Sequence, residues 1–265
     1  MNDPLFSLQD KIVILTGGMG RLGREYTKCL QARGARVVVL DRAEAIANAV
    51  PSDSLLPLAA NVLIRAELES ALKTIEQHWG TPTGLINNAA LDSPPNSPAE
   101  ENGPFETYPE KSWDAVMDVN VKGVFLCCQV FGGAMAVAGR GSIINIGSIY
   151  GAVSPDQRIY TYRQKDGNAF FKPVAYSASK SALYNLTRYL ATYWAAREVR
   201  VNTLTLAGVS DNQDENFLKG YLARMPLGRM AAADDYFGPV VLLLSEASKY
   251  MTGSDLVVDG GWTAW

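Results

Sequence analysis

A tyrosine and a lysine four positions apart are the side chains of this sequence best suited to acid–base chemistry. Tyr176 and Lys180 lie in a segment with helical spacing, and an interval of four residues brings both onto one face of a helix. A neighbouring ammonium favours the phenolate, so Tyr176 can exchange a proton with a substrate oxygen. Ser148, which follows an apolar run, can hydrogen-bond the same oxygen, or it can cap a turn or helix.

A glycine-rich stretch lies nearer the N-terminus, where a predicted strand gives way to a helix. Residues 16–23 read Thr-Gly-Gly-Met-Gly-Arg-Leu-Gly. Backbone without side chains can approach a pyrophosphate at a helix N-terminus, so the stretch predicts a dinucleotide site. The residues expected to contact the dinucleotide are Gly17, Gly20, Arg21, Leu22 and Gly23. A glycine-rich turn that binds nothing is the alternative interpretation.

Asp41 ends the second predicted strand and bears on the choice of cofactor. A carboxylate at that place accepts hydrogen bonds from the adenosine ribose hydroxyls and repels a 2′-phosphate, so the sequence favours NAD. Arg42 and Arg21 are basic side chains that could accommodate the phosphate. NADP is therefore the alternative cofactor.

These groups need a scaffold, and the apolar pattern predicts alternating strands and helices. Expected strands are the short apolar runs at residues 11–15, 36–40, 55–59, 84–87, 141–146, 199–206 and 256–258. Expected helices cover residues 21–33, 65–79, 111–138, 174–197 and 234–246. Together they predict one doubly wound α/β domain, with a seven-stranded parallel sheet of the Rossmann type. Ligands of such sheets bind at the carboxyl ends of the strands.

Two connections are long and rich in proline, glycine or polar residues, at about 91–109 and 151–173. Both follow predicted strands, so both lie on the ligand side. The second has an excess of basic residues, and arginine suits carboxylate or phosphate recognition because its fork donates paired hydrogen bonds. Arg158 and Arg163 therefore predict an anionic, hydroxyl-rich substrate such as a sugar phosphate, nucleotide sugar or sugar acid. A solvated loop or a subunit contact is the alternative.

The composition argues against several other functions. The 265 residues carry a formal net charge of −3, which gives no basic face for nucleic acid or an anionic membrane, so a small-molecule substrate is expected. Since no apolar run reaches the ~18 residues of a membrane span and no secretory signal is recognisable, we expect a cytoplasmic protein. The three cysteines are an odd number and are expected to be reduced. Histidine occurs once, so no metal site is expected.

Taken in order along the chain, these motifs resemble those of the short-chain dehydrogenase/reductase family, and the resemblance covers essentially the whole sequence. Besides the residues above, it includes Asn61-Val62, Asn87-Asn88-Ala89-Ala90, Asn120 and the closing segment 250–261. The resemblance implies an NAD(P)-dependent oxidoreductase that interconverts a secondary alcohol and a ketone by hydride transfer. In its long interval before Tyr176, the chain also looks similar to a branch associated with flagellin and nonulosonic-acid glycans.

The resemblance also implies a role for each residue. Tyr176 would move the proton, Lys180 would bind the nicotinamide ribose and lower the tyrosine pKa, and Ser148 would orient the substrate. Asn120 would hold a water molecule in a proton relay. Further cofactor contacts would come from Asn61, Val62, Asn88, Ala89, Gly208 and Val209. Members of the family are usually dimers or tetramers packed through two long helices, so a homotetramer or homodimer is expected.

The sequence departs from the family pattern in a few places. Arg21 stands where the family has its middle glycine, and residues 206–208 replace a Pro-Gly turn under the nicotinamide. The interval from Ser148 to Tyr176 is longer than is usual in the family. Two other functions stay open for these reasons. One is a non-catalytic dinucleotide-binding sensor or scaffold, and the other is an epimerase or dehydratase that holds its NAD tightly.

Overall fold

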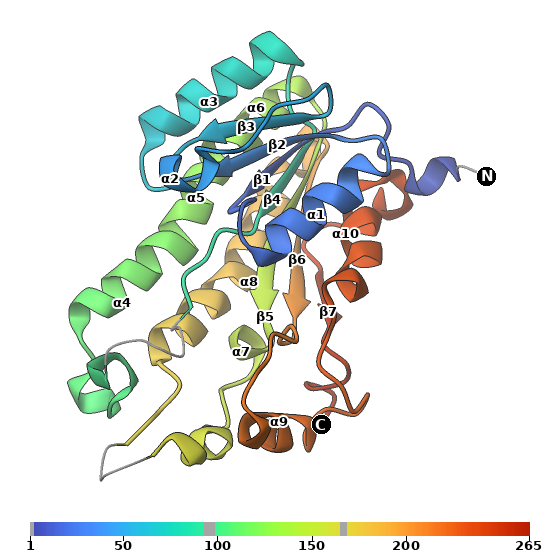
Figure 1. The fold of residues 1–265 in the computed structure, drawn as a ribbon. Helices are drawn as coiled ribbons and strands as arrows, with labels where there is room; N and C mark the ends of the chain where they lie inside the picture. The colour runs from blue at the N-terminus through green and yellow to red at the C-terminus, as the bar shows by residue number, and fades with distance from the viewer. Residues whose placement is uncertain (1–2, 93–98, 165–168) are drawn as a thin grey trace.

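The computed structural model describes residues 3–92, 99–164 and 169–265 of the chain. Within these residues, seven strands form one parallel sheet in the spatial order β3-β2-β1-β4-β5-β6-β7 (Figure 1). The strands are β1 (Ile12–Thr16), β2 (Arg36–Asp41), β3 (Leu55–Ala59), β4 (Gly84–Asn87), β5 (Gly141–Ser148), β6 (Val199–Leu206) and β7 (Asp255–Val258). The predicted doubly wound sheet is confirmed. Its strand order reverses between β1 and β4, which is where such sheets bind ligands.

The helices are α1 (Arg21–Gln31), α2 (Ala43–Ile46), α3 (Arg65–His78), α4 (Glu110–Met117), α5 (Val124–Cys127), α6 (Gly133–Ala138), α7 (Ile149–Ala152), α8 (Val174–Trp194), α9 (Glu215–Leu222) and α10 (Phe237–Leu244). Helices α4, α5 and α6 belong to one continuous helical stretch, because residues 118–123 and 128–132 between them are π-helical. The helix predicted over 111–138 is therefore one continuous helix, Glu110–Ala138, that contains two π-helical segments, and it is called the helical rod below. Helix α10 begins later than predicted, because residues 233–236 form a 3₁₀ turn.

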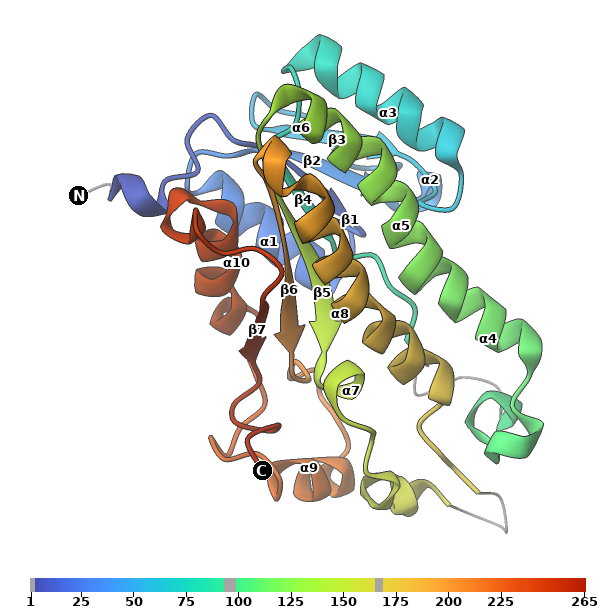
Figure 2. The same cartoon turned by 180° about the vertical axis from the view of Figure 1, so that it is seen from behind.

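Helices cover both faces of the sheet (Figures 1 and 2). On one face, α3, α5, α6 and α8 pack on the strands through side chains such as Ile75 and Leu183. On the other face, α1 and α10 pack through side chains such as Leu30. Neighbouring strand residues serve the two layers in turn, since Ile14 faces the first layer and Leu15 the second. Burial on both faces explains why the strands read as continuous apolar runs.

The helical stretch Glu110–Ala138 is long and apolar enough to cross a membrane, by length and composition alone. Half of its most apolar window is buried inside the protein. There, side chains such as Val124 and Phe131 pack against the sheet and α8. The apolar character of this stretch is therefore explained by its place in the core of the α/β domain.

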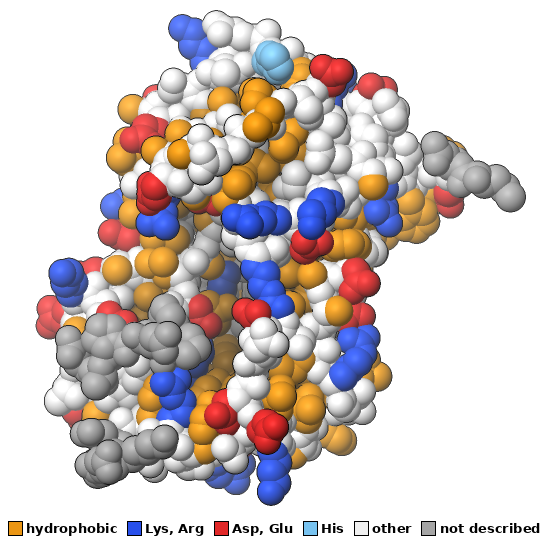
Figure 3. Space-filling model, viewed as in Figure 1, with side chains coloured by type: hydrophobic (Ala, Val, Ile, Leu, Met, Phe, Trp, Pro, Cys, Tyr) orange, Lys and Arg blue, Asp and Glu red, His pale blue; other side chains and the backbone are white. Residues whose placement is uncertain are grey.

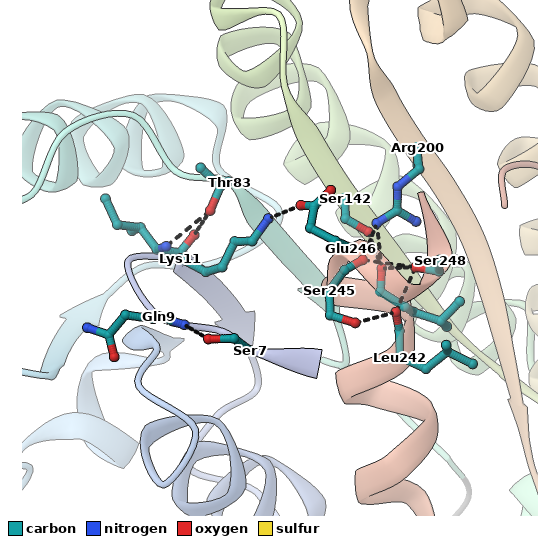
Figure 4. Close-up of polar contacts among 12 residues, drawn as sticks. Ser7, Gln9, Lys11, Thr83, Ser142, Arg200, Leu242, Ser245, Glu246 and Ser248 are labelled. Carbon is teal, nitrogen blue, oxygen red and sulfur yellow. Dashed lines mark hydrogen bonds and ion pairs between the residues drawn. The ribbon is translucent and has the colours of Figure 1, made fainter. Parts of the chain in front are cut away.

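A cluster of polar side chains lies at the amino ends of β5 and β6 (Figure 4). The guanidinium of Arg200, in β6, donates to the main-chain carbonyls of Leu243, Ser245 and Met251 at 2.9 to 3.3 Å. These carbonyls lie at the end of α10 and beyond it, where the last helical carbonyls have no intrahelical partner. The hydroxyl of Ser142, in β5, donates to the Leu243 carbonyl at 2.6 Å. The cluster therefore ties α10 to the sheet.

Replacing Arg200 by methionine is expected to lower the free energy of unfolding by about 2 kcal/mol, because three main-chain carbonyls lose a charged donor. Arg197 is an exposed arginine shortly before it and is the matched control. Its methionine variant should change stability by less than about 0.5 kcal/mol. Chemical denaturation measures both variants, and an equal loss in the two would show that Arg200 does not hold α10 in place.

Candidate active site

A cavity of about 1070 Å³ opens at the carboxyl ends of the strands. Its walls come from the start of α1, the residues after β4, the end of β5, the start of α8 and the loop after β6. Figure 3 shows a hollow in this face of the molecule, with acidic and basic side chains around it. The cavity brings together many of the residues singled out from the sequence: Arg21, Leu22, Asn88, Ser148, Arg163, Tyr176, Lys180, Gly208 and Val209.

The glycine stretch forms a turn that requires glycine at two positions. Gly17 has a φ of +63°, in the left-handed region, and a Cβ there would lie 2.8 Å from the Cα of Ala89. A Cβ on Gly23 would lie 2.4 Å from the carbonyl oxygen of Gly17. Gly20 then leads into α1 and leaves no side chain over the helix N-terminus. Exposed amides at the positive end of a helix dipole fit a pyrophosphate, so the turn suits the predicted dinucleotide.

Thr16 and Asn88 hold this turn against the end of β4. The Thr16 hydroxyl accepts hydrogen bonds from the backbone N–H groups of Asn88 and Ala89, at 3.0 and 3.1 Å. The Asn88 side-chain amide donates to the carbonyls of Thr16 and Gly17, at 3.0 and 3.1 Å. Asn88 and Ala89 therefore hold the glycine turn in place. The side-chain amide of Asn88 already donates its hydrogen bonds to main-chain carbonyls of this turn.

Arg21 is the first residue of α1, so its backbone is helical and the turn itself does not require glycine there. Its guanidinium donates to the carbonyl of Ser210 and forms an ion pair with Asp211 at 3.0 Å. Both partners follow β6, so Arg21 links the start of α1 to the loop across the cavity. The departure from the family glycine therefore adds a contact between the two sides of the site.

Asp41 lies beside the glycine turn rather than on the cavity lining. One carboxylate oxygen accepts from the backbone N–H of Met19 at 2.9 Å, and the other accepts from the N–H of Arg42 at 2.9 Å. The carboxylate therefore joins the end of β2 to the turn. It remains partly exposed, as a group that accepts hydrogen bonds from a ribose must be.

Asn61 and Val62 follow β3 and also lie outside the cavity lining. Asn61 accepts from the N–H of Leu63 at 3.0 Å and donates its own N–H to Glu67 at 2.7 Å. Val62 packs against the helical rod at Gly123, where a Cβ would lie 2.9 Å from its methyl group. The pair is therefore held in a tight turn between the sheet and the rod.

Asn120 is fully buried in the π-helical turn 118–123, and such turns often occur at functional sites. Its side-chain oxygen accepts from the N–H of Leu91 at 2.7 Å, and its nitrogen donates to the Leu91 carbonyl and to the Ser179 hydroxyl, each at 2.9 Å. Ser179 in turn donates to the carbonyl of Tyr176 at 2.7 Å. Asn120 thus fastens the chain after β4 to the start of α8.

Ser148, Tyr176 and Lys180 form one group at the inner end of the cavity. The Ser148 side chain caps α7 by accepting from the N–H of Tyr150 at 3.2 Å, and it also hydrogen-bonds the Tyr176 hydroxyl. Lys180 donates to the carbonyl of Ile146 at 2.7 Å, and its Nζ lies 5.8 Å from the ring centroid of Tyr176. The cap considered for Ser148 is therefore present, and its hydroxyl also lies beside the phenol of Tyr176.

Burial dominates the protonation of this group. It lowers the pKa of Lys180 to about 8, although the carboxylate of Asp92 opposes the shift. Burial also raises the pKa of the Tyr176 phenol, Asp92 raises it further, and the hydrogen bond with Ser148 lowers it. This direction is opposite to the lowered tyrosine pKa that the resemblance implied, because burial and the charge of Asp92 outweigh the hydrogen bond with Ser148. Tyr176 is therefore a neutral phenol, ready to donate a proton.

The turn after β6 is built with residues that the sequence did not single out. The N–H of Gly208 donates to the Tyr221 hydroxyl at 2.9 Å, and Val209 pairs with Ala231 in an isolated bridge. Tyr221, in α9, stacks on Trp262 with 4.3 Å between ring centroids. No sequence pattern links Tyr221 to Gly208, because the contact depends on how α9 packs beyond the carboxyl ends of the strands (Figure 1).

The connection 151–173 folds in part as the 3₁₀ segment 157–163. Arg158 lies outside the cavity lining, and its side chain is 86% exposed and paired with Asp156 at 2.7 Å. Arg163 does line the cavity, and its guanidinium stacks on the ring of Phe170 at 4.3 Å. Residues 93–98 and 165–168, which belong to the two predicted insertions, lie outside the described residues.

Asp92 is a candidate site residue that the sequence reasoning missed, and Lys172 entered that reasoning only as one of the basic residues of the connection 151–173. Both line the cavity, and they form an ion pair at 2.5 Å. Nζ of Lys172 lies 5.2 Å from the ring centroid of Tyr176. Asp92 carried one signal in the sequence, its place two residues after the strand-end motif 87–90. Its pairing with Lys172 joins two loops, and no local pattern predicts such a contact.

The described part of the chain offers few side chains suited to metal binding or thiol chemistry. Within residues 3–92, 99–164 and 169–265, no group of three histidine, cysteine, aspartate or glutamate side chains could hold a metal ion. Cys29, Cys127 and Cys128 are buried free thiols. Burial raises the pKa of Cys29, Cys127 and Cys128, which disfavours the reactive thiolate.

Comparison with known proteins adds an independent line of evidence. A sequence model described as "Enoyl-(Acyl carrier protein) reductase" matches residues 20–263. The galactitol 2-dehydrogenase of Rhizobium johnstonii is 31% identical over 275 residues, which span 98% of this chain and 98% of that protein. The similarity therefore extends over nearly the full length of the chain.

Solved structures agree in fold. A short chain dehydrogenase from Leptospira borgpetersenii with bound NAD+ superposes with a TM-score of 0.84 and 32% identity, over 97% of this chain and 94% of that one. A gluconate 5-dehydrogenase from Burkholderia cenocepacia, in complex with NADP and tartrate, gives a TM-score of 0.85 and 25% identity, over 99% and 98%. One neighbour binds NAD+ and the other NADP, so the likeness supports a nicotinamide dinucleotide without choosing between the two.

Proposed function

The chain belongs to the short-chain dehydrogenase/reductase family, and from that premise we propose its substrate class and the role of each residue in its site. The protein is an NAD(P)-dependent oxidoreductase that interconverts a secondary alcohol and a ketone by hydride transfer. Our proposal is that the alcohol is a polyhydroxylated compound of the sugar-alcohol or sugar-acid type. The substrate class rests on relatives named for a polyol and a polyhydroxy acid, and the reaction rests on the meeting of Ser148, Tyr176 and Lys180 in a cavity beside the glycine turn.

We assign proton transfer to Tyr176. In alcohol oxidation its oxygen takes the proton of the substrate hydroxyl, and in ketone reduction its hydroxyl returns one. Ser148, hydrogen-bonded to the same phenol, orients the substrate oxygen. When bound, a nicotinamide would supply the hydride acceptor for alcohol oxidation and, in its reduced form, the hydride donor for ketone reduction. Oxidation of the alcohol releases a proton overall, so alkaline pH favours oxidation and acidic pH favours reduction.

Lys180 and the glycine turn are the proposed anchors of the dinucleotide. The turn would hold the pyrophosphate at the N-terminus of α1, and Lys180 would hold the nicotinamide ribose. Gly208 and Val209 would contact the nicotinamide, and Asn120 would support the proton relay implied by the family by fixing the start of α8 through Ser179. The adenine side would be completed by Asn61 and Val62, with Asn88 and Ala89 beneath the turn.

We propose NAD as the preferred cofactor because of Asp41. Exchange of Asp41 for serine is expected to shift the ratio of kcat/KM values from NAD toward NADP by about 10-fold or more, because the carboxylate that repels a 2′-phosphate is lost. Steady-state kinetics with both cofactors measures the ratio. The control is Asp53→Ser, since Asp53 is exposed and lies before β3, at the amino ends of the strands, whereas Asp41 lies at the carboxyl end of β2. A ratio that stays the same in Asp41→Ser would contradict the assignment.

Two kinds of polyhydroxylated substrate fit the relatives. The galactitol 2-dehydrogenase relative is named for a neutral polyol, and the gluconate 5-dehydrogenase neighbour is named for a polyhydroxy acid. Arg163 on the cavity wall supports an acid, as first inferred from the basic connection, while Arg158 lies outside the lining. The narrower likeness to the flagellin and nonulosonic-acid branch also implies an acidic sugar, and it stays a prediction.

Turnover of a substrate panel tests the proposal. Polyols, polyhydroxy acids, sugar phosphates and simple secondary alcohols are supplied with NAD and NADP, and formation of the reduced nicotinamide is followed by its absorbance. We expect the highest kcat/KM with a polyol or polyhydroxy acid. A clear preference for apolar alcohols would contradict the substrate class. Sugar epimerisation without net reduction of NAD would instead support the epimerase alternative, and dinucleotide binding without turnover would support the sensor.

We propose a homotetramer or homodimer formed through the helical rod and α8. Large side chains are exposed on these elements: Phe125, Val137, Tyr189 and Tyr193. Tyr189 and Tyr193 stack on one another at 6.0 Å between centroids and form an aromatic ridge on α8. Such exposed apolar side chains are typical of subunit interfaces.

A cytoplasmic location stays a proposal that rests on the acidic composition and the free thiols.

A further inference from the structure

The two long connections meet in a charge pair beside the proposed proton-transfer group. Lys172 Nζ lies 2.5 Å from an oxygen of Asp92. Lys172 belongs to the connection 151–173 and Asp92 to the connection 91–109. A backbone hydrogen bond of 2.8 Å from the N–H of Phe171 to the carbonyl of Asn102 joins the same two connections. The roles assigned so far do not account for this pair.

Lys172 is held firmly by its own chain. The side-chain amide of Gln157 accepts from the Lys172 N–H at 2.8 Å and donates to the Lys172 carbonyl at 3.2 Å. The Lys172 side chain is only 11% exposed. Its Nζ lies 5.2 Å from the ring centroid of Tyr176, compared with 5.8 Å for Lys180. The ammonium groups of Lys180 and Lys172 therefore both lie near the phenol of Tyr176. The two hydrogen bonds from Gln157 hold the backbone of Lys172 in place.

The carboxylate of Asp92 acts on the same region of the cavity. Its charge contributes to the raised pKa of Tyr176, and also to the raised pKa values of Tyr150 and Tyr160. The hydroxyls of Tyr150 and Tyr160 lie 3.0 Å apart, and both residues line the cavity. The charge pair therefore lies on a wall that also carries aromatic rings, next to the place where the substrate oxygen must lie.

We propose that Asp92 and Lys172 set substrate specificity by binding the hydroxyl on the carbon next to the reacting carbinol. A hydroxyl can donate to a carboxylate and accept from an ammonium at the same time. An alkyl group there would remove water from both charges without replacing their hydrogen bonds. A carboxylate there would meet the like charge of Asp92. The pair therefore selects a neutral vicinal diol over a mono-alcohol and over a 2-hydroxy acid, which narrows the substrate class on which this inference rests.

Three small substrates of similar shape test the pair: 1,2-propanediol, 2-butanol and lactate. In Lys172→Met, the ratio of kcat/KM for the diol to that for 2-butanol should fall about 10- to 100-fold. Asp92→Asn keeps the side-chain shape and removes the charge, so the ratio of lactate to diol should rise about 10-fold. Lys122→Met is the control, because Lys122 is an exposed lysine paired with Asp118 away from the cavity.

Wild-type ratios in both variants would overturn the role of the pair and leave the proposed function standing. Absence of turnover with every alcohol would overturn the proposed function instead. In that case, saturation-transfer NMR with galactitol still tests the pair. A signal seen with the wild type and lost in Lys172→Met supports the proposal, whereas an equal signal in the two, or none with the wild type, overturns it.

Discussion

Replacing Tyr176 by phenylalanine is expected to lower kcat for alcohol oxidation by about 10²- to 10⁴-fold and to leave dinucleotide binding unchanged. The variant loses only the hydroxyl that takes the substrate proton, while the ring keeps its packing against the aromatic cluster of the cavity. Steady-state kinetics with the best substrate of the panel measures the loss. Calorimetric titration with NAD measures the binding.

The matched control for this variant is Tyr193→Phe. Tyr193 lies on the same helix, α8, and is 66% exposed. Its variant should retain the kcat of the wild type. If Tyr176→Phe kept more than about a tenth of the wild-type kcat, proton transfer would have to be assigned to another group.

Replacing Lys180 by methionine should abolish turnover and at the same time stabilise the fold. Burial lowers the pKa of Lys180 to about 8, which means that the folded protein carries a poorly solvated ammonium at neutral pH. Methionine fills similar space without the charge, at the loss of one hydrogen bond to Ile146. We therefore expect the free energy of unfolding to rise by about 1 to 3 kcal/mol at neutral pH. Denaturant titration at neutral pH measures the change.

The pH dependence of stability gives this prediction a second readout. The folded-state pKa of Lys180 lies below that of an unfolded lysine, about 10.4. Between about pH 8 and that value, the unfolded chain binds more protons, so the contribution of this group to stability rises with pH. Below pH 8 both states are protonated and the cost of burying the charge stays constant. In Lys180→Met this rise should disappear.

The control is Lys249→Met, because Lys249 is exposed and lies in the turn after α10. Its variant should keep both the wild-type activity and the wild-type pH dependence of stability. A Lys180→Met protein that is less stable than the wild type at neutral pH would show that the bond to Ile146 outweighs the cost of the buried charge. An active Lys180→Met enzyme would contradict the role of the lysine itself.

The sheet and most of the site could be predicted from the sequence because they depend on local patterns. Apolar runs buried on both faces indicate parallel strands, and a glycine turn between a strand and a helix indicates a phosphate site. The interval between Tyr176 and Lys180 sets their geometry through the helix period alone. Gly17 and Gly23 were readable for the same reason, since their need for glycine arises within the turn.

The parts that escaped prediction depend on contacts between distant segments. The ion pair of Asp92 and Lys172 joins two loops, and the support of Gly208 by Tyr221 depends on the packing of α9. The direction of the Tyr176 pKa depends on how deeply α8 is buried, which helical spacing does not reveal. The π-helical turn at Asn120 was also missed, and its contacts are with distant segments, since Asn120 bonds the main chain of Leu91 and Gly123 lies against Val62.

Isotope transfer tests the central claim most directly. The protein is incubated with NAD and with the best polyol of the substrate panel, deuterated on its carbinol carbons, and the dinucleotide and the oxidised product are analysed by mass spectrometry. Hydride transfer predicts one deuterium in the reduced dinucleotide for each ketose formed, and none when Tyr176→Phe replaces the wild type. Oxidised product without deuterium in the dinucleotide, or isotope transfer undiminished in Tyr176→Phe, would contradict the account.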